Sequence, residues 1–107
     1  MKVSESFLEK AWGGSVDNPK IEDIKVAILE TKNMDEEHGA FWVGIFNDKE
    51  EEIVLEVHKN LKTILIIDSA SVEEKSITAE SWEKVIENYD NLLKGDIGKI
   101  IDWINKK

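Results

Sequence analysis

The sequence of 107 residues contains no cysteine, no arginine and only one proline. The absence of cysteine excludes disulfide bonds, thiolate zinc sites and a cysteine nucleophile. The absence of arginine removes the side chain that most often recognises phosphates and guanine edges through two parallel hydrogen bonds. Cysteine chemistry is therefore excluded, and nucleic acid is a poor candidate partner.

Negative charge dominates the composition. The chain has 23 acidic residues against 14 lysines, which gives a formal net charge of -9 at pH 7. Such a surface repels nucleic acids and anionic membranes, whereas it attracts positive protein surfaces and speeds encounter with them. We therefore expect a basic protein partner, and neither a nucleic acid nor a membrane.

The length and the hydrophobic content are those of one globular domain. Hydrophobic residues make up 41% of the chain and charged residues 35%, which is enough apolar side chain for a core. Residues 1–12 include Glu5, Glu9 and Lys10, so they lack the apolar centre of a signal peptide. No apolar run approaches membrane-spanning length. We expect a single cytoplasmic domain over residues 1–107.

The first third of the chain contains one helical pattern. Alternation over residues 2–8 indicates an edge strand, and the paired glycines within residues 12–15 indicate a turn. Asp17 and Asn18 precede the only proline, which suits the first position of a helix. An apolar stripe with steps of three and four then predicts a helix from Pro19 to about Asn33.

The middle of the chain is rich in strand patterns. Residues 40–46 are apolar at both parities, which predicts a central strand covered on both faces for part of its length. Residues 53–58 and 61–67 follow, separated by a tight turn at Lys59 and Asn60, so three consecutive strands form an antiparallel meander. Residues 75–78 are expected to add a short edge strand.

The last quarter predicts two helices. Thr78 is the expected cap of the first, in which an apolar stripe runs from Trp82 to Leu93 and ends before Gly95. Asp96 is the expected cap of the second, over residues 97–104. The fold class is therefore α+β: an N-terminal helix, an antiparallel meander of three to five strands, and two C-terminal helices.

No catalytic or metal-binding pattern stands out. His38 follows three acidic residues, which could supply metal ligands, but acidic residues in a turn are normally solvated. Neither His38 nor His58 has the partner spacing of a serine triad, and 23 acidic residues guarantee accidental carboxylate pairs. We expect no enzyme activity, no cofactor and no bound metal.

The four tryptophans are candidate contact residues, because tryptophan is enriched at binding hot spots. Trp42 lies within a predicted strand and Trp82 begins a helical stripe, so both are expected in the core. Trp103 lies one residue off the apolar line of its helix, which predicts partial exposure. For Trp12 the pattern favours neither location.

Acidic clusters occupy predicted turns. Residues 35–37 form one such turn and residues 48–52 another. Alternate turns of a meander lie at the same end of the sheet, so these two clusters are expected at opposite ends. Their acidic side chains cannot be assumed to form one continuous surface.

Several local strings, in this order, resemble the small immunity proteins of bacterial polymorphic toxin systems, including contact-dependent growth inhibition. They are Trp12-Gly13-Gly14, Asn18-Pro19 before an amphipathic helix, Asp35-Glu36-Glu37-His38-Gly39 before the meander, and Glu80-Ser81-Trp82 before the C-terminal helices. The similarity covers residues 12–104, and the closest pattern is the immunity family often paired with deaminase or nuclease toxins.

The resemblance implies a non-catalytic cytoplasmic inhibitor of a toxin C-terminal domain made by a neighbouring gene. An acidic inhibitor suits such a toxin, because nucleases are often basic on their substrate face. The family supplies no catalytic residues to carry over. The predicted partner-binding residues rest on charge and expected exposure alone: Asp35, Glu36, Glu37, Asp48, Glu50, Glu51 and Trp103.

Two other functions remain open at this point. The protein could be an adaptor or regulatory subunit for another basic protein or peptide, or a small carboxylate enzyme with a metal at His38. The oligomeric state is open too, with a monomer favoured. An exposed edge formed by residues 2–8 or 75–78 could also pair with a partner strand.

Overall fold

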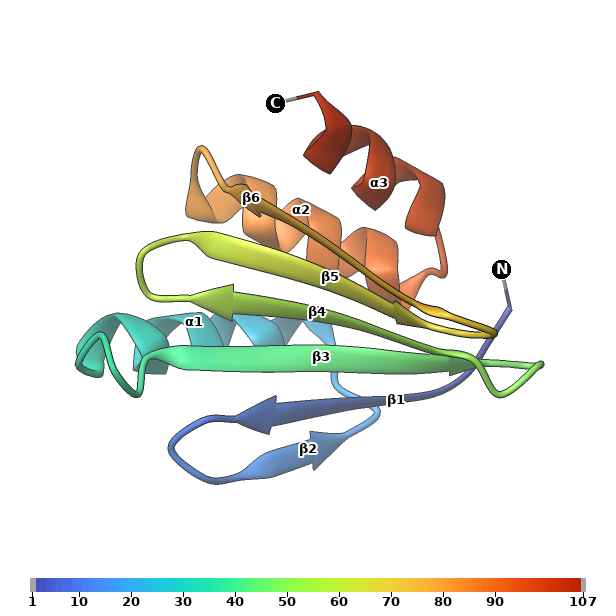
Figure 1. Ribbon diagram of the computed structural model, residues 1–107. Coiled ribbons are helices and arrows are strands. Elements are labelled where there is room, and N and C mark those ends of the chain that lie inside the picture. Colours follow the sequence, from blue (N-terminus) through green and yellow to red (C-terminus); the bar gives the residue numbers. More distant parts are fainter. Residues whose placement is uncertain (1, 107) are drawn as a thin grey trace.

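The computed structural model describes residues 2–106 as a six-stranded antiparallel sheet with three helices (Figure 1). In chain order the elements are β1 (Val3–Lys10), β2 (Ser15–Asp17), α1 (Ile21–Asn33), β3 (Ala40–Asn47), β4 (Glu52–His58), β5 (Lys62–Asp68), β6 (Val72–Thr78), α2 (Trp82–Leu93) and α3 (Ile97–Asn105). The α+β class is confirmed, but the sheet has six strands where three to five were expected. None of the helices within the described range is long and apolar enough to cross a bilayer.

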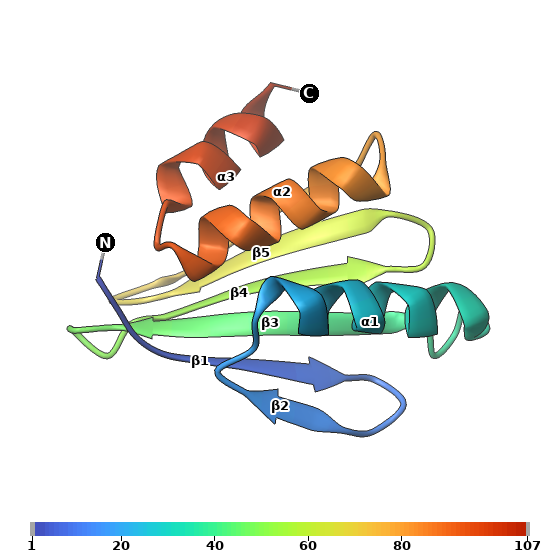
Figure 2. The same cartoon turned by 180° about the vertical axis from the view of Figure 1, so that it is seen from behind.

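The strand order is β2-β1-β3-β4-β5-β6, so the predicted meander is confirmed and extends through β6. Helices α1 and α2 lie side by side on one face of the sheet, and α3 packs against α2 next to β6 (Figure 2). The opposite face carries no helix (Figure 1). The sheet is therefore covered on one side by residues 2–106 and open on the other.

The core lies between the sheet and the helices. Along β4, the odd-numbered residues Ile53, Leu55 and Val57 are buried and the even-numbered residues are only partly buried. The same parity is buried in β3 and β5, and α1 and α2 close the core with Ile28, Val85 and other side chains. This two-residue alternation is expected of a sheet with one covered face.

The predicted element order is wrong at the N-terminus. Two strands precede the first helix, and β1 lies inside the sheet between β2 and β3 rather than at an edge. Asn18 has a φ of 51°, and its backbone N–H donates to the carbonyl of Ser6 at 3.0 Å. Asn18 thus extends the pairing of β2 with β1 by one residue instead of capping a helix, and α1 begins only at Ile21.

The three predicted helices are confirmed, and Asp96 is the cap of α3 as expected, but the caps of α1 and α2 differ from those predicted. The cap of α1 is Lys20, whose backbone N–H donates to the Asp23 carboxylate at 2.8 Å. The cap of α2 is Ser81, whose hydroxyl accepts the Lys84 backbone N–H at 3.2 Å. Thr78 instead ends β6, an edge strand that has seven residues where four were predicted.

Tyr89 links the helical layer to the centre of the sheet. Its hydroxyl donates to the Leu55 carbonyl at 2.8 Å, and its ring stacks on Phe41 with ring centres 5.3 Å apart. Burial raises the pKa of the Tyr89 hydroxyl well above its ordinary value of 10.0, and the Glu56 carboxylate adds to the rise. The folded protein therefore holds this hydroxyl protonated.

Replacing Tyr89 with phenylalanine is expected to lower the free energy of unfolding by about 1 kcal/mol at neutral pH, because one buried hydrogen bond is lost. In the unmutated protein, the Tyr89 hydroxyl ionises above pH 10 in the unfolded state but stays protonated in the folded state. The contribution of Tyr89 to the free energy of unfolding is therefore lost as pH rises beyond 10. The difference in the free energy of unfolding between the native protein and the phenylalanine variant should therefore become smaller above pH 10.

Tyr89 is the only tyrosine of the chain, so tyrosinate absorbance measures its ionisation directly. We expect that absorbance to rise together with the loss of folded structure, followed by circular dichroism. A tyrosinate signal that appears at pH 10 while the protein stays folded would contradict this burial.

Candidate protein-binding face

The uncovered side of the sheet is called here the open face. Strand register and the alternation of side chains assign its members, since directly paired residues point to the same side. They are Glu5, Phe7 and Glu9 of β1; Ser15 and Asp17 of β2; Ala40, Trp42, Gly44 and Phe46 of β3; Glu52, Val54, Glu56 and His58 of β4; Lys62, Ile64, Ile66 and Asp68 of β5; and Val72, Glu74, Ser76 and Thr78 of β6.

The open face combines apolar and acidic side chains. Its centre is aromatic and aliphatic, and the members of this centre are only partly buried: Phe7, Trp42, Phe46, Val54, Ile64 and Ile66. Seven carboxylates share the face with one lysine, Lys62: Glu5, Glu9, Asp17, Glu52, Glu56, Asp68 and Glu74. This surface has the composition of a binding site for a positively charged protein.

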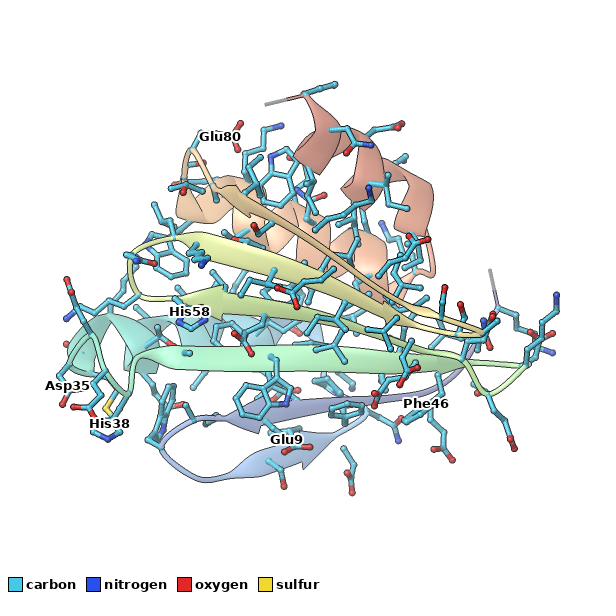
Figure 3. All side chains as sticks on the ribbon, viewed as in Figure 1. Glu9, Asp35, His38, Phe46, His58 and Glu80 are labelled. Atoms are coloured by element: carbon cyan, nitrogen blue, oxygen red, sulfur yellow. The ribbon has the colours of Figure 1, made fainter. Side chains whose placement is uncertain are left out.

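Two aromatic residues stand between carboxylates in neighbouring strands. Trp42 is paired with Glu9 on one side and Glu56 on the other. Phe46 is paired in the same way with Glu5 and Glu52. Figure 3 shows Glu9 and Phe46 on this side of the sheet. Of the four glutamate carboxylates, only that of Glu56 has a hydrogen-bonded partner among the described residues, the ring Nε2 of His58 at 2.6 Å.

The position of Phe7 depends on Gly44, its directly paired neighbour. A Cβ atom built at Gly44 would overlap the Phe7 ring, which therefore lies over the glycine backbone. The ring also contacts Phe46, with ring centres 6.0 Å apart. The missing side chain at position 44 thus allows a compact aromatic group to form on the open face.

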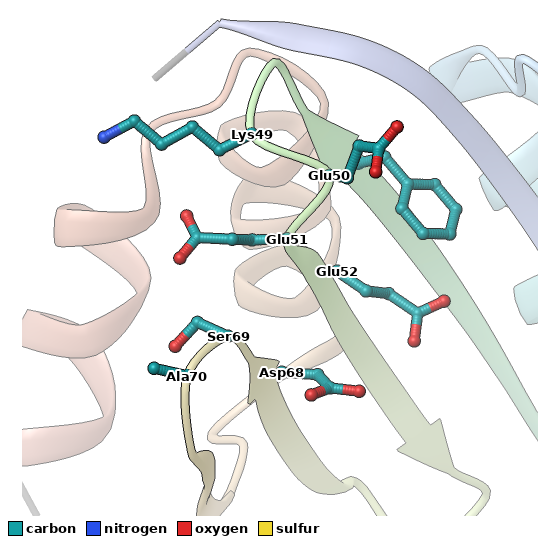
Figure 4. Close-up of a pocket in the computed structure, with 8 residues that line it drawn as sticks. Lys49, Glu50, Glu51, Glu52, Asp68, Ser69 and Ala70 are labelled. Carbon is teal, nitrogen blue, oxygen red and sulfur yellow. The ribbon is translucent and has the colours of Figure 1, made fainter.

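The surface is hollowed around Phe46. One hollow of about 470 Å³ lies between the β3–β4 turn and the end of β5, and another of about 400 Å³ lies toward Ser4 and Glu5. In the first, Glu52 and Asp68 are directly paired across β4 and β5, and Figure 4 shows both side chains pointing to the same side. Like charges in such a pair repel each other, so a bound cation there would relieve the repulsion.

The acidic turns lie at opposite ends of the sheet, as expected from the meander. Asp48 and Glu50 are exposed in the β3–β4 turn, with Glu51 partly buried beside them. The Asn47 side chain holds this turn by accepting the backbone N–H groups of Lys49 and Glu51 at 2.9 and 3.0 Å. Since Glu50 and Glu51 line the same hollow as Glu52, this turn adjoins the open face.

The other turn holds exposed Asp35, Glu36 and Glu37 at the far end (Figure 3). The Asp35 carboxylate accepts the His38 backbone N–H at 2.8 Å and contacts the His38 ring Nδ1 at 2.9 Å. The backbone hydrogen bond from His38, and next its side chain, lower the pKa of the Asp35 carboxyl. Asp35 is therefore a structural residue of the turn. No group of three possible metal ligands occurs in residues 2–106.

The expected exposure of Trp103 is wrong. Its side chain is only 8% exposed, and its indole N–H donates to the Glu80 carboxylate at 2.8 Å. In α3 the buried stripe consists of Ile97, Ile100, Trp103 and Ile104, whereas Ile101 is partly exposed. The buried stripe of α3 thus includes Trp103 in place of the predicted Ile101, because α3 packs on α2 next to β6.

Of the two tryptophans expected in the core, Trp82 packs against it and Trp42 does not. Trp42 is partly exposed on the open face, since helices cover β3 on one side only. Trp82 is partly buried against the core, and Lys32 Nζ lies 5.5 Å from its ring centre. Trp12 is partly exposed next to Lys10. Of the four, Trp42 is the one on the open face.

Replacing Gly44 with alanine is expected to destabilise the protein by about 1–3 kcal/mol, because the added methyl group displaces the Phe7 ring. Gly98 of α3 is a matched control, since a Cβ there meets no atom within 4 Å. Alanine at position 98 should stabilise the helix by about 0.5–1 kcal/mol. Chemical denaturation measures both, and equal effects would contradict the placement of Phe7.

Comparison of the chain with protein-family models, curated proteins and solved structures finds no significant match.

Proposed function

We propose that this protein is an immunity protein that binds and neutralises a cognate bacterial toxin domain, a nuclease or a deaminase. The observation that supports the proposal best is the open face: an apolar centre with seven carboxylates and one lysine, which no element of residues 2–106 covers. Such a face suits a folded protein with a basic surface.

The proposed mechanism is steric and electrostatic. A toxin that acts on a nucleic acid needs a positive substrate-binding face. An acidic protein bound to that face competes with the nucleic acid for the same charges and blocks access to the active site. The acidic turns at the two ends of the sheet would attract the toxin over a longer range and raise the association rate.

Co-expression tests the function directly. Cells that produce the toxin domain encoded next to this gene should survive when this protein is present, and the two chains should purify as a one-to-one complex. The neighbouring product expressed alone should be toxic. If it is toxic and this protein gives neither survival nor a complex, the immunity function is wrong, and retention of another basic protein would favour the adaptor.

Charge reversal tests the role of the acidic turns. Glu36→Lys together with Glu50→Lys should lower the association rate with the toxin domain about tenfold at low salt, with little change in the dissociation rate. The matched control is Glu87→Lys with Asp102→Lys, exposed positions on α2 and α3 that change the net charge equally. Stopped-flow kinetics at low and high salt measure both variants.

The difference between the two variants should become small at high salt, because salt screens interactions between exposed charges. If the turn variant and the helix variant slow association equally, only the net charge matters, and the turns play no specific part in steering.

A further inference from the structure

We propose that the two rows formed by Glu9, Trp42 and Glu56, and by Glu5, Phe46 and Glu52, each receive one arginine side chain of the basic partner. This inference rests on the proposed function for the identity of the partner. It adds the docking surface, the chemical group recognised and the spacing between the two recognised groups.

The rows have the three parts that a guanidinium group needs. An aromatic ring attracts a cation over its face, and it also stacks on the flat guanidinium plane. Carboxylates on both sides can each accept hydrogen bonds from the N–H groups at the rim of that plane. In the first row the ring is Trp42, the aromatic residue with the strongest cation–π interaction, and the carboxylates are Glu9 and Glu56.

The second row also offers room for a long side chain. Phe46 lines both hollows of the open face, of which one includes Glu5 and the other Glu52 and Asp68. An arginine stem lying against the ring would bring its guanidinium group to these carboxylates. The repulsion between the paired Glu52 and Asp68 side chains would then become an attraction for the ligand.

Among the described residues, one side chain already contacts a carboxylate of the rows: the His58 ring Nε2 lies 2.6 Å from the Glu56 carboxylate. The chain contains no arginine, and none of Glu5, Glu9 and Glu52 forms an ion pair with a described residue. On the open face the single lysine, Lys62, belongs to β5 and is paired with Thr78 of β6, away from β1 and β3. Glu9 in the first row and both carboxylates of the second row are therefore available to cations from outside.

The spacing of the rows specifies the partner further. Trp42 and Phe46 are four residues apart in β3, which corresponds to roughly 13 Å along a strand. The partner should therefore present two arginines about that far apart on one surface. Between the rows lie Phe7, Gly44 and Val54, which would contact an apolar part of the partner.

Docking on the face fits the sheet better than addition of a partner strand to an edge. The edge strand β2 has only three residues, and β6 carries three charged residues, Glu73, Glu74 and Lys75, which oppose strand addition. By contrast, the five longer strands, about 4.8 Å apart with seven residues rising about 3.3 Å each, give an area of roughly 450 Å². This is of the same order as the roughly 800 Å² that each partner buries in a stable complex.

Peptide titration tests the inference without the toxin. The probes are two capped peptides of equal charge, one with two arginines separated by three glycines and one with two lysines in the same places. In nuclear magnetic resonance spectra, the arginine peptide should shift the Trp42 indole N–H signal and bind at least threefold more tightly than the lysine peptide. The preference should disappear in Trp42→Leu with Phe46→Leu.

Three further variants control the experiment. Trp42→Phe keeps an aromatic ring and should keep part of the arginine preference, which separates loss of the ring from loss of folding. Glu5→Gln with Glu9→Gln should weaken binding of both peptides more than Glu36→Gln with Glu37→Gln, which removes the same charge from a turn. Equal binding of the two peptides by the native protein, or no effect of the leucine variants, would overturn the inference.

The cognate toxin domain separates this inference from the proposed function. If the native protein protects cells and the leucine variants fold but lose at least tenfold in affinity, both hold. If the leucine variants protect and bind as well as the native protein, the function holds and the arginine rows are wrong. If no protection occurs but the peptide preference is present, the rows hold and the partner is another basic protein.

Discussion

The alternation of side chains along β3, β4 and β5 is the constraint on which the rest of the structure depends. Each strand must send neighbouring residues to opposite faces, and helices cover only one of these faces. Burying Phe41, Val43 and Ile45 against α1 and α2 therefore fixes Trp42 and Phe46 on the open face. A register shift of one residue would expose the core, so the composition of the open face is a direct consequence of core packing.

Two contacts restrain parts of the open face. Tyr89 ties α2 to the backbone of β4 at Leu55, which lies next to Val54 and Glu56 of the open face. The Phe7 ring lies over Gly44 and contacts Phe46, so the aromatic group is held from the β1 side as well. A surface whose side chains are already ordered loses less conformational entropy on binding, and that favours affinity for a partner of complementary shape.

The sequence predicts the elements with long, regular patterns. The stripe from Trp82 to Leu93 and the meander after Ala40 are both found, because their periods of 3.6 and 2 are evident without tertiary information. By contrast, β2 has three residues and no pattern of its own. It is a strand only through its pairing with β1, which is a tertiary contact, and the positive φ of Asn18 follows its last residue.

The candidate site is harder to predict, because it depends on which face the helices leave uncovered. Residues 40–46 are apolar at both parities, so they do not reveal that one parity faces outward. The even-numbered residues of β3 face outward because α3 packs on α2 and not across the other face of the sheet. The same packing of α3 buries Trp103. In β4, however, Glu52, Glu56 and His58 alternate with a strictly buried set, and this is the one local signal of an uncovered polar face.

An uncovered face with an apolar centre has to avoid pairing with a second copy of itself. Two open faces brought together would oppose seven carboxylates to seven others, with one lysine on each side. The desolvation and repulsion of these charges act against self-association, whereas a basic partner turns the same charges into attraction. In the proposed complex the carboxylates would therefore act in two ways: they oppose association with a second copy, and they attract the basic partner to the exposed apolar centre.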